Sequence, residues 1–562
     1  MVRSRRAFKA NGCSHKETAA RERLPGRARR PVLRGASLAA LACLTMTCSN
    51  GRAPTRATSD VARTAFDVRV AVLTDLQGYL EPCGCQSRPL GGIDKLAAKL
   101  DQLASERLPM LLLLSGNVFF GGLPAGAQNE AAKAQEIWKA QLLAELLGEL
   151  GASAVAPGPA DLSHGVATLG SLKRTARFPL LAYGESLSSD AAKPEAFKAT
   201  SLHRLGKATV GVWGLSPLSK PLELPAIERA SRKLTARLRG QGAQIVIGLL
   251  YAKRRLARRA LANIRGLDFV VDRGLEQAIP QPPTRVAGGP VFLSAGRQGH
   301  GLVVLDLIRK EEGGFTDVGD WARQRRTNGL ARRIADLQRR IAGWEKDRQV
   351  NQRDVDRQRR RLEHLLAELR EVQAAPQPQG NIFASRWIEL APEIAGKPSV
   401  KARVDAYDRR VNAHNRRALA DWKPPPAAKG AARYVGSRKC GACHAAAFAW
   451  WRTHAHGRAY ATLERLDKQF NLSCVGCHVT GYNKPGGSTV VHNRGLTNVG
   501  CESCHGPGSR HPAPELSSVT REVAERVCVT CHNEEHSDRF SYPTYRAALL
   551  VPGHGKPLKA AE

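Results

Sequence analysis

The pattern Cys-x-x-Cys-His occurs four times in the last quarter of the chain and is the clearest chemical signal in the sequence. The four copies span residues 440–444, 474–478, 501–505 and 528–532. Two cysteines three residues apart on a short helical turn reach both vinyl groups of one porphyrin, and the next residue places an imidazole beneath the iron. With 13 Cys and 16 His among 562 residues, chance predicts about 0.01 such motifs. We therefore expect four covalently bound c-type haems.

These motifs assign a role to each of their residues. The expected haem-attachment residues are Cys440, Cys443, Cys474, Cys477, Cys501, Cys504, Cys528 and Cys531. The expected proximal iron ligands are His444, His478, His505 and His532. Zinc ribbons or disulfides would leave the histidine after every cysteine pair unexplained.

Distal ligands must come from other histidines of this region, which are His454, His456, His492, His511, His536 and His554. We expect His454, His511 and His554 to ligate iron, with His456 as the main competitor of His454. The short stretches between motifs leave little room for ordinary apolar packing, so porphyrins should supply much of the core.

Residues 434–562 resemble the tetrahaem cytochrome c family that accepts electrons from hydroxylamine oxidoreductase. The shared segments are Cys440-Gly-Ala-Cys-His, Trp451-Arg-Thr-His454 and Gly500-Cys-Glu-Ser-Cys-His-Gly-Pro-Gly-Ser-Arg-His511. The resemblance implies closely stacked, mostly bis-histidine, low-spin haems that carry electrons. It also implies that one haem lacks a distal protein ligand.

Apolar runs alternate with helical stretches between residue 67 and about residue 307. Strands are expected at 68–73, 109–114, 178–182, 209–215, 245–250, 269–271, 290–293 and 301–307. Helices are expected at 93–103, 130–147 and 227–238. This alternation predicts a layered α/β domain with a buried sheet core.

The same region resembles the 5'-nucleotidase branch of the metallophosphoesterases, which implies a calcineurin-like α/β sandwich. The segments that carry the likeness are Ala71-Val-Leu-Thr-Asp-Leu-Gln-Gly-Tyr-Leu, Gly91-Gly-Ile-Asp-Lys-Leu, Leu111-Leu-Leu-Leu-Ser-Gly-Asn and Val291-Phe-Leu-Ser-Ala-Gly.

That family holds two metals, and most of its ligands are missing here. Asp75 remains, but Gln77, Asn117 and Asp161 stand at the positions of other ligands. The family's histidine after the strand at 245–250 is also missing, and Tyr251 stands near its position. The late His-x-His would fall near residues 272–275, which contain no histidine. Amide and carbonyl oxygens hold transition metals poorly, so we expect a degenerate scaffold without two-metal hydrolysis. Cys83-Gly-Cys85 nearby is either a small redox or metal site or a pair of free thiols in a turn.

A heptad pattern follows the α/β region. Between Leu330 and Val372, ten of thirteen a and d positions are apolar, which predicts a coiled-coil seam. The competing interpretation is a helical hairpin that folds back at the polar middle of the seam. A helical segment near residues 386–421 and a proline-rich linker at 424–430 then lead to the haem motifs.

The N-terminus indicates export. A basic region at 1–34, an apolar stretch at 35–47 and small residues at 48–50 resemble a secretory signal, with Cys43 or Cys48 as the candidate lipid-bearing residue of a lipoprotein. A disordered basic arm is the alternative. The formal net charge is 86 − 50 = +36, but only 5% of the residues are aromatic, so no nucleic-acid partner is expected.

These features predict a multidomain chain. A signal peptide (1–52) precedes a degenerate metallophosphoesterase or 5'-nucleotidase-like domain (66–308). A coiled-coil helix (322–375) and a helical segment with a linker (376–430) then lead to a mostly α or irregular tetrahaem cytochrome c domain (434–562). We expect an exported electron carrier, periplasmic or facing the periplasm from the outer membrane. Its expected partners are redox proteins, a membrane surface through the lipid, and a second copy through the coiled coil. The alternatives are an enzyme that reduces a small nitrogen or oxygen compound at an open haem, and a working nucleotidase.

Overall fold

The structure is a computed structural model that describes ten stretches of the chain. They are residues 66–82, 87–121, 129–183, 197–216, 221–272, 280–347, 349–374, 380–511, 518–533 and 536–556. The expected signal peptide with Cys43 and Cys48, the Cys83/Cys85 pair and residues 273–275 of the late histidine position lie outside the described residues.

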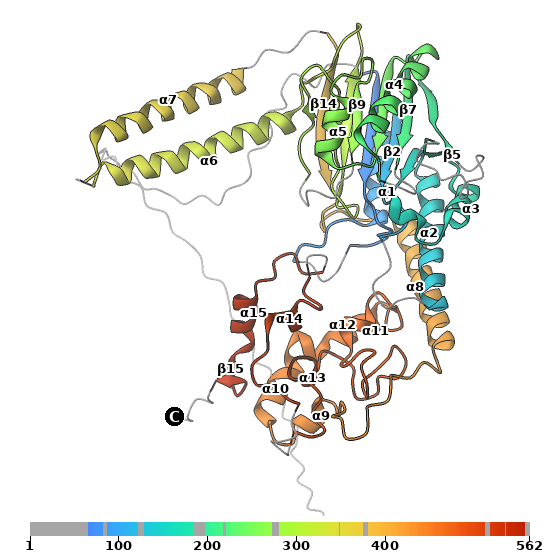
Figure 1. The fold of residues 1–562 in the computed structure, drawn as a ribbon, viewed down its shortest axis with the longest axis vertical. Coiled ribbons are helices and arrows are strands. Elements are labelled where there is room, and N and C mark those ends of the chain that lie inside the picture. Colours follow the sequence, from blue (N-terminus) through green and yellow to red (C-terminus); the bar gives the residue numbers. More distant parts are fainter. Residues whose placement is uncertain are drawn as a thin grey trace, which may run out of the picture. The chain divides into compact units, whose positions relative to one another are not determined.

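Two β-sheets form the centre of the N-terminal region (Figure 1). The larger sheet has the strand order β13-β14-β12-β1-β2-β3-β4-β5, with β1, β2 and β3 parallel and β12 antiparallel to β1. Its strands are β1 (Val68–Thr74), β2 (Met110–Gly116), β3 (Ala152–Pro157), β4 (Leu180–Leu181), β5 (Phe197–Lys198), β12 (Gly301–Ile308), β13 (Thr316–Asp317) and β14 (Ile382–Glu389).

The second sheet has the order β10-β11-β9-β8-β7-β6. Its strands are β6 (Thr200–Leu205), β7 (Ala208–Leu215), β8 (Ile245–Leu250), β9 (Phe269–Asp272), β10 (Thr284–Arg285) and β11 (Val291–Leu293). Strands were correctly predicted where the sequence has continuous apolar runs, as at β1 and β8, because such runs are buried on both faces.

Helices cover the outer face of each sheet and complete four layers. Helices α1 (Ile93–Ser105), α2 (Glu130–Glu149), α3 (Val166–Ala176) and α8 (Pro398–Ala418) pack on the larger sheet, whereas α4 (Leu224–Gly240) and α5 (Arg254–Leu261) pack on the smaller one. Side chains along β1 alternate between two cores, since Val70 and Val72 face the other sheet and Ala71 and Leu73 face the helices. The expected α/β sandwich is therefore confirmed, and η2 (Pro159–Leu162) adds one short turn after β3.

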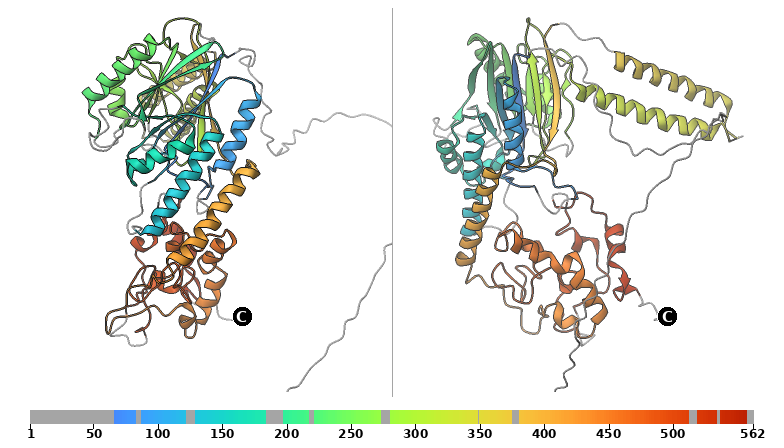
Figure 2. Two further views of the ribbon diagram at one scale, coloured as in Figure 1. Left: turned by 90° about the vertical axis from the view of Figure 1, so that its right-hand side faces the viewer. Right: turned by 180° about the vertical axis from the view of Figure 1, so that it is seen from behind.

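The connector differs from the expected continuous helix. Helix α6 (Asp320–Trp344) ends seven residues before α7 (Gln352–Ala374) begins, and the two helices pair through a shared apolar seam (Figure 2). The polar middle of the heptad pattern forms the turn, so the hairpin alternative describes the structure.

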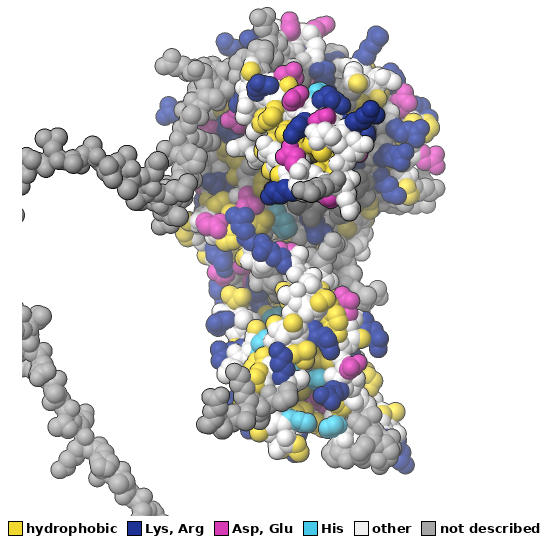
Figure 3. All heavy atoms as spheres, turned by 90° about the vertical axis from the view of Figure 1, so that its left-hand side faces the viewer, with side chains coloured by type: hydrophobic (Ala, Val, Ile, Leu, Met, Phe, Trp, Pro, Cys, Tyr) yellow, Lys and Arg dark blue, Asp and Glu magenta, His cyan; other side chains and the backbone are white. Residues whose placement is uncertain are grey.

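Lys and Arg side chains lie among Asp and Glu over the part of the surface shown in Figure 3.

Strand β14 is a second difference from the sequence analysis. It lies at residues expected to be a helical segment, and it pairs antiparallel with β12 over eight residues, from Gly301↔Glu389 to Ile308↔Ile382. Helix α8 then contributes Val400 and Val404 to the core of the sandwich. The α/β domain therefore extends well beyond residue 308.

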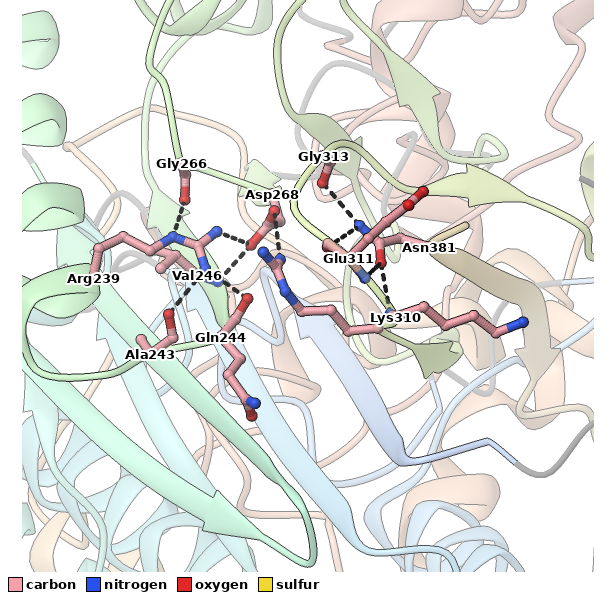
Figure 4. Close-up of polar contacts among 11 residues, drawn as sticks. Arg239, Ala243, Gln244, Val246, Gly266, Asp268, Lys310, Glu311, Gly313 and Asn381 are labelled. Carbon is pink, nitrogen blue, oxygen red and sulfur yellow. Dashed lines mark hydrogen bonds and ion pairs between the residues drawn. The ribbon is translucent and has the colours of Figure 1, made fainter. Parts of the chain in front are cut away.

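Buried polar contacts hold the amino-terminal edge of the smaller sheet and the turn that leads back to β14 (Figure 4). Asp268 accepts hydrogen bonds from Arg239 (2.6 Å) and the backbone of Val246 (2.8 Å). Burial raises the pKa of Asp268, and Arg239 opposes this shift. The Asn381 side chain accepts from the backbone amides of Lys310 (2.8 Å) and Glu311 (3.0 Å). The side chains of Asp268 and Asn381 thus form hydrogen bonds within the fold, and we assign them a structural role.

The C-terminal region consists of short helices joined by irregular segments. Its elements are α9 (Ser437–Cys440), α10 (Ala445–Thr453), η5 (Ala455–Arg458), α11 (Ala459–Arg465), α12 (Val475–His478), α13 (Cys501–His505), α14 (Glu525–Cys528), α15 (Tyr542–Leu549), β15 (Val551–Pro552) and β16 (Gly555–Lys556). Helices α10, α14 and α15 bury no residue among protein atoms. None of the helices in the described stretches is long and apolar enough to cross a membrane.

Candidate haem site

Each Cys-x-x-Cys-His motif folds as one tight turn. In the first motif, the amides of Cys443 and His444 donate to the carbonyl of Cys440 (3.2 and 2.8 Å). In the fourth, the amide of His532 donates to the carbonyl of Cys528 (2.9 Å). None of the eight motif cysteines forms a disulfide among the described residues. The turns therefore present two thiols and an imidazole together, which is the arrangement that covalent haem attachment needs.

A single large cavity joins the four motifs. Its volume is about 3690 Å³, and it is lined by all eight motif cysteines, all four motif histidines, and His454, His456, His511, His536 and His554. A pocket for one small ligand typically occupies a few hundred cubic ångströms, so the cavity has room for several large planar groups. It also fits the lack of buried side chains in α10, α14 and α15.

Three pairs of histidine rings face one another at the spacing of two axial ligands. Two imidazoles on one iron have centroids about 6.3 Å apart, which is twice the sum of a ~2.0 Å metal–nitrogen bond and ~1.15 Å within the ring. The centroid distances in the structure are 6.1 Å for His444 and His511, 6.2 Å for His505 and His554, and 6.0 Å for His456 and His532. Two of the three expected distal residues, His511 and His554, thus lie opposite a motif histidine.

Hydrogen bonds fix which nitrogen of several rings is available to a metal. A carbonyl oxygen only accepts, so a ring Nδ1 bonded to it carries the proton and leaves a lone pair on Nε2. This applies to His478 with Ala459 (2.6 Å), His505 with Thr520 (2.7 Å) and His554 with Leu549 (2.7 Å). In these rings Nε2 is therefore the nitrogen suited to bind iron.

His454 is placed differently from His456. The Nδ1 of His454 accepts a hydrogen bond from the backbone amide of His456 (3.2 Å), and its ring stacks on Trp450 at 4.6 Å. A neutral imidazole has one nitrogen lone pair, and His454 uses it on this amide. Burial, with smaller effects of His454 and His532, lowers the pKa of His456 to about 4, so that ring is neutral at physiological pH. The geometry favours the competitor, His456, over His454.

His478 has no such partner among the described rings. The other three motif histidines each face a second histidine, whereas the structure gives His478 only its bond to the Ala459 carbonyl. His492 does not line the cavity. Its ring Nε2 bonds the carbonyl of Ala420 (2.6 Å) instead.

Contacts between thiols relate the motifs to each other. Interaction with the Cys501 thiol raises the pKa of Cys440, and interaction with the Cys477 thiol lowers the pKa of Cys531 to about 6, so the thiols of each pair are neighbours. Groups attached to the first and third motifs would consequently be neighbours, and so would groups attached to the second and fourth. His456, which follows the first motif, faces His532 of the fourth and connects the two pairs.

Asp161, one of the residues at an expected ligand position of the α/β domain, bonds the backbone of neighbouring loops. Asp161 is fully buried and accepts hydrogen bonds from the backbone amides of Val118, Phe119, Phe120 and Gly158, at 2.7–3.1 Å. Burial raises the pKa of Asp161 to about 7 against the effect of these amides. All of its acceptor capacity is directed at the backbone.

The remaining positions of the expected metal site bond to one another. The amide of Asn117 donates to Asp75 Oδ1 (3.0 Å), its side-chain Nδ2 lies 3.4 Å from the Tyr251 hydroxyl, and its Oδ1 accepts from Ala160 (2.9 Å). Asp272 forms an ion pair with Arg254 (2.9 Å). Within the described ranges, the one group of three potential metal ligands is Glu81, Asp405 and Asp408, which lies elsewhere. The donor set therefore does not fit two metal ions.

The fold and the site together define a c-type cytochrome region joined to a calcineurin-like α/β sandwich. Residues 439–506 match the family model described as cytochrome c554 and c-prime. This match implies covalently bound haem, and the cavity, thiols and ring nitrogens fit that group. No curated protein matches the chain.

Solved structures resemble the α/β region. They include a 5'-nucleotidase precursor from Thermus thermophilus (16% identity, TM-score 0.41, 62% of this chain and 59% of that one). An NAD nucleotidase from Haemophilus influenzae (14%, 0.36, 44% and 48%) and a calcineurin-like phosphoesterase from Bacillus subtilis (14%, 0.33, 44% and 86%) are further examples. The chain thus spans about three fifths of the first structure. At TM-scores below 0.5 these likenesses carry no argument about activity.

Proposed function

We propose that this chain is an exported tetrahaem electron-transfer protein. The observation that carries the proposal is the spacing of three histidine pairs at 6.0–6.2 Å across one cavity that contains all eight motif thiols. Cys440, Cys443, Cys474, Cys477, Cys501, Cys504, Cys528 and Cys531 would attach the haems, and His444, His478, His505 and His532 would ligate the irons. The bound haems would supply one-electron redox chemistry.

The distal ligands in this proposal are His511, His554 and His456. The Leu549 carbonyl fixes the available nitrogen of His554 (2.7 Å), and the ring of His456 is partly buried, so little rearrangement of these two rings should accompany a change of one electron at the iron. The thiol contacts between the first and third motifs and between the second and fourth support two pairs of adjacent haems. Adjacent haems joined through the His456–His532 pair would form one continuous path for electrons.

The α/β domain serves in this proposal as a binding or docking scaffold without hydrolytic activity. Asp161, Asn117 and Asp75 are engaged in internal hydrogen bonds where a phosphoesterase holds metals. Purified protein should release no phosphate from nucleotides in the presence of divalent metal ions. Metal-dependent release above that of a no-protein control would favour the nucleotidase alternative.

The test is to produce the full chain in a host that attaches c-type haem and measure its intact mass and spectra. Four haems add four increments of about 600 Da each, and removal of a signal peptide or addition of lipid appears in the same mass. Three low-spin bis-histidine haems and one with a different spin state are expected by electron paramagnetic resonance. Colourless protein, or fewer than four increments, would refute the proposal.

A second candidate function follows from His478, because no described histidine faces its ring. A small nitrogen or oxygen compound could bind and be reduced at the haem of the second motif. Binding of nitric oxide or carbon monoxide that shifts the spectrum of one haem, with turnover under reducing conditions, would support this function. Four six-coordinate low-spin haems would exclude it.

A further inference from the structure

A buried cluster of charges lies where the α/β domain meets the segment before the second haem motif. We name it the interface cluster, and it consists of Glu81, Lys401, Asp408 and Lys468. The ammonium of Lys468 hydrogen-bonds Glu81 and lies 3.2 Å from Asp408 Oδ2, and the ammonium of Lys401 is 3.4 Å from Glu81 Oε1. Only 5% of the Asp408 side chain and 17% of the Lys468 side chain are exposed.

The four groups of the interface cluster sum to +2 − 2 = 0 when all are ionised, but Asp405 lies beside them and pairs with Lys401. With Asp405 included, three carboxylates share two ammonium groups, so the sum is +2 − 3 = −1. One carboxylate oxygen each of Glu81, Asp405 and Asp408 lies within 4.8 Å of the other two. Carboxylates this close repel one another when all are ionised, which favours a proton on one of them.

The pKa values agree with a proton held in this cluster. Burial and the neighbouring Glu81 raise the pKa of Asp408 to about 7 against the opposing effect of Lys468. Burial lowers the pKa of Lys468, but Glu81 and Asp408 together raise it above its usual value. The lysine therefore stays charged, and Asp408 is the carboxyl group that titrates near neutral pH.

The groups on the neighbouring elements do not supply a competing proton. On α2, Glu136 and Lys139 pair with each other at 2.9 Å. On α8, the Tyr407 hydroxyl donates to the carbonyl of Gln135 (3.2 Å), and burial raises the pKa of Tyr407 well above its usual value.

Short backbone links connect the interface cluster to the second haem motif. The amide of Asn471 donates to the carbonyl of Lys468 (2.9 Å), and the amide of Cys474 donates to the carbonyl of Asn471 (3.1 Å). Two consecutive turns thus separate Lys468 from the first attachment cysteine. Glu81, Asp408 and Lys468 also line the same cavity as Cys474 and Cys477.

We infer that the Glu81–Asp408 carboxyl pair of the interface cluster is a proton-binding site coupled to reduction of the haem attached at Cys474 and Cys477. The inference rests on the proposed function, which supplies the haem and the electron. An electron from a neighbouring haem of the same chain reduces the iron, and a proton from water binds a carboxylate oxygen of the pair. One negative charge arrives and one positive charge arrives, so the buried region keeps its total charge.

The sign of the coupling follows from electrostatics. The added electron makes the second-motif haem more negative, which raises the affinity of the nearby carboxylate for a proton. The pKa of the carboxyl pair is higher when the haem is reduced than when it is oxidised. At a pH between these two values, reduction of the haem is accompanied by uptake of a proton, so the reduction potential falls as pH rises. The limit is one proton per electron, which is about 59 mV per tenfold change in proton concentration.

The test is a spectroelectrochemical titration of the full haem-loaded chain at pH 6, 7, 8 and 9, with the absorbance change resolved into four one-electron steps. Wild type should show one potential that falls with pH in the interval above pH 7. Asp408→Asn removes the titrating carboxyl and should flatten that dependence. Asp336→Asn is the control, since this aspartate lies on α6, outside the interface cluster, with 65% of its side chain exposed, and it should behave as wild type.

Glu81→Gln removes the other member of the pair and replaces Asp408→Asn if that variant does not fold. Equal pH dependence in wild type, Asp408→Asn and Glu81→Gln would overturn the inference, as would four potentials that do not vary with pH in wild type. Both results are distinct from failure of the proposed function, because the haem number and spectra are measured on the same samples.

Discussion

A backbone hydrogen bond separates the two histidines that follow the first haem motif. His454 accepts from the amide of His456 and stacks on Trp450, while His456 faces His532. Sequence spacing cannot distinguish two histidines two residues apart, because the difference depends on which ring nitrogen is already used. At this scale the spacing of the motifs is enough to predict the attachment residues, whereas the choice among the distal histidines requires the structure.

This difference predicts the effects of two substitutions. His456→Ala should remove the distal ligand of the fourth-motif haem, and one of the three low-spin signals should be lost. His454→Ala should leave the three low-spin signals in place, because that ring is engaged with a backbone amide. Electron paramagnetic resonance of the oxidised proteins checks this, with haem content as the control. Loss of a low-spin signal in His454→Ala but not in His456→Ala would show that the assignment is reversed.

At the scale of elements, one buried carboxylate holds the loops after two strands of the α/β domain. Four backbone amides after β2 and β3 donate to Asp161, so this carboxylate fixes both loops. Backbone strain is concentrated at the same edge, since Asp75, Gln77 and Gln298 all have positive φ (43°, 55° and 56°). Such conformations persist only where the surrounding structure imposes them.

Asp161→Asn should destabilise this edge by about 2–4 kcal/mol, because an amide nitrogen replaces one acceptor oxygen and leaves buried amides without a partner. Hydrogen exchange of the full chain should therefore accelerate in peptides that cover residues 118–120. Asp336→Asn, at an exposed position of α6 with 65% of its side chain exposed, should change exchange at these residues very little. Unchanged protection in Asp161→Asn would contradict the structural role of this carboxylate.

The sequence predicts elements well where they are local and apolar. Strand β8 (Ile245–Leu250) was predicted at its exact bounds because all six of its residues are buried and apolar or glycine. The sequence does not predict strand β14, because the strand contains Arg386 and is not a continuous apolar run. Its partner β12 is also distant along the chain, since the helical hairpin lies between them in the sequence. The hairpin itself was only one of two interpretations, since a heptad seam does not specify which helix it pairs with.

At the scale of the whole chain from residue 66, one glutamine joins three parts of the sequence. The side chain of Gln135 on α2 donates to Asn471 (3.0 Å) and Ser473 (3.2 Å), and accepts from Asn415 on α8 (2.9 Å) and from the amide of Leu472 (3.2 Å). These partners lie 280–338 residues away along the chain, so no local pattern could have identified them.

Gln135→Leu tests whether the α/β sandwich positions the second haem motif. The substitution removes four hydrogen bonds worth about 1 kcal/mol each. It takes the acceptor from the Leu472 amide and leaves the Asn415 amide group with only the Phe470 carbonyl as acceptor among the described residues. Hydrogen exchange in residues 468–478 should therefore accelerate in the full haem-loaded chain, and the potential of one haem should shift. The control Gln338→Leu, on the exposed face of α6, should alter neither readout. If exchange at 468–478 and all four potentials match wild type in Gln135→Leu, the haem region is positioned by its own porphyrins and not by the sandwich.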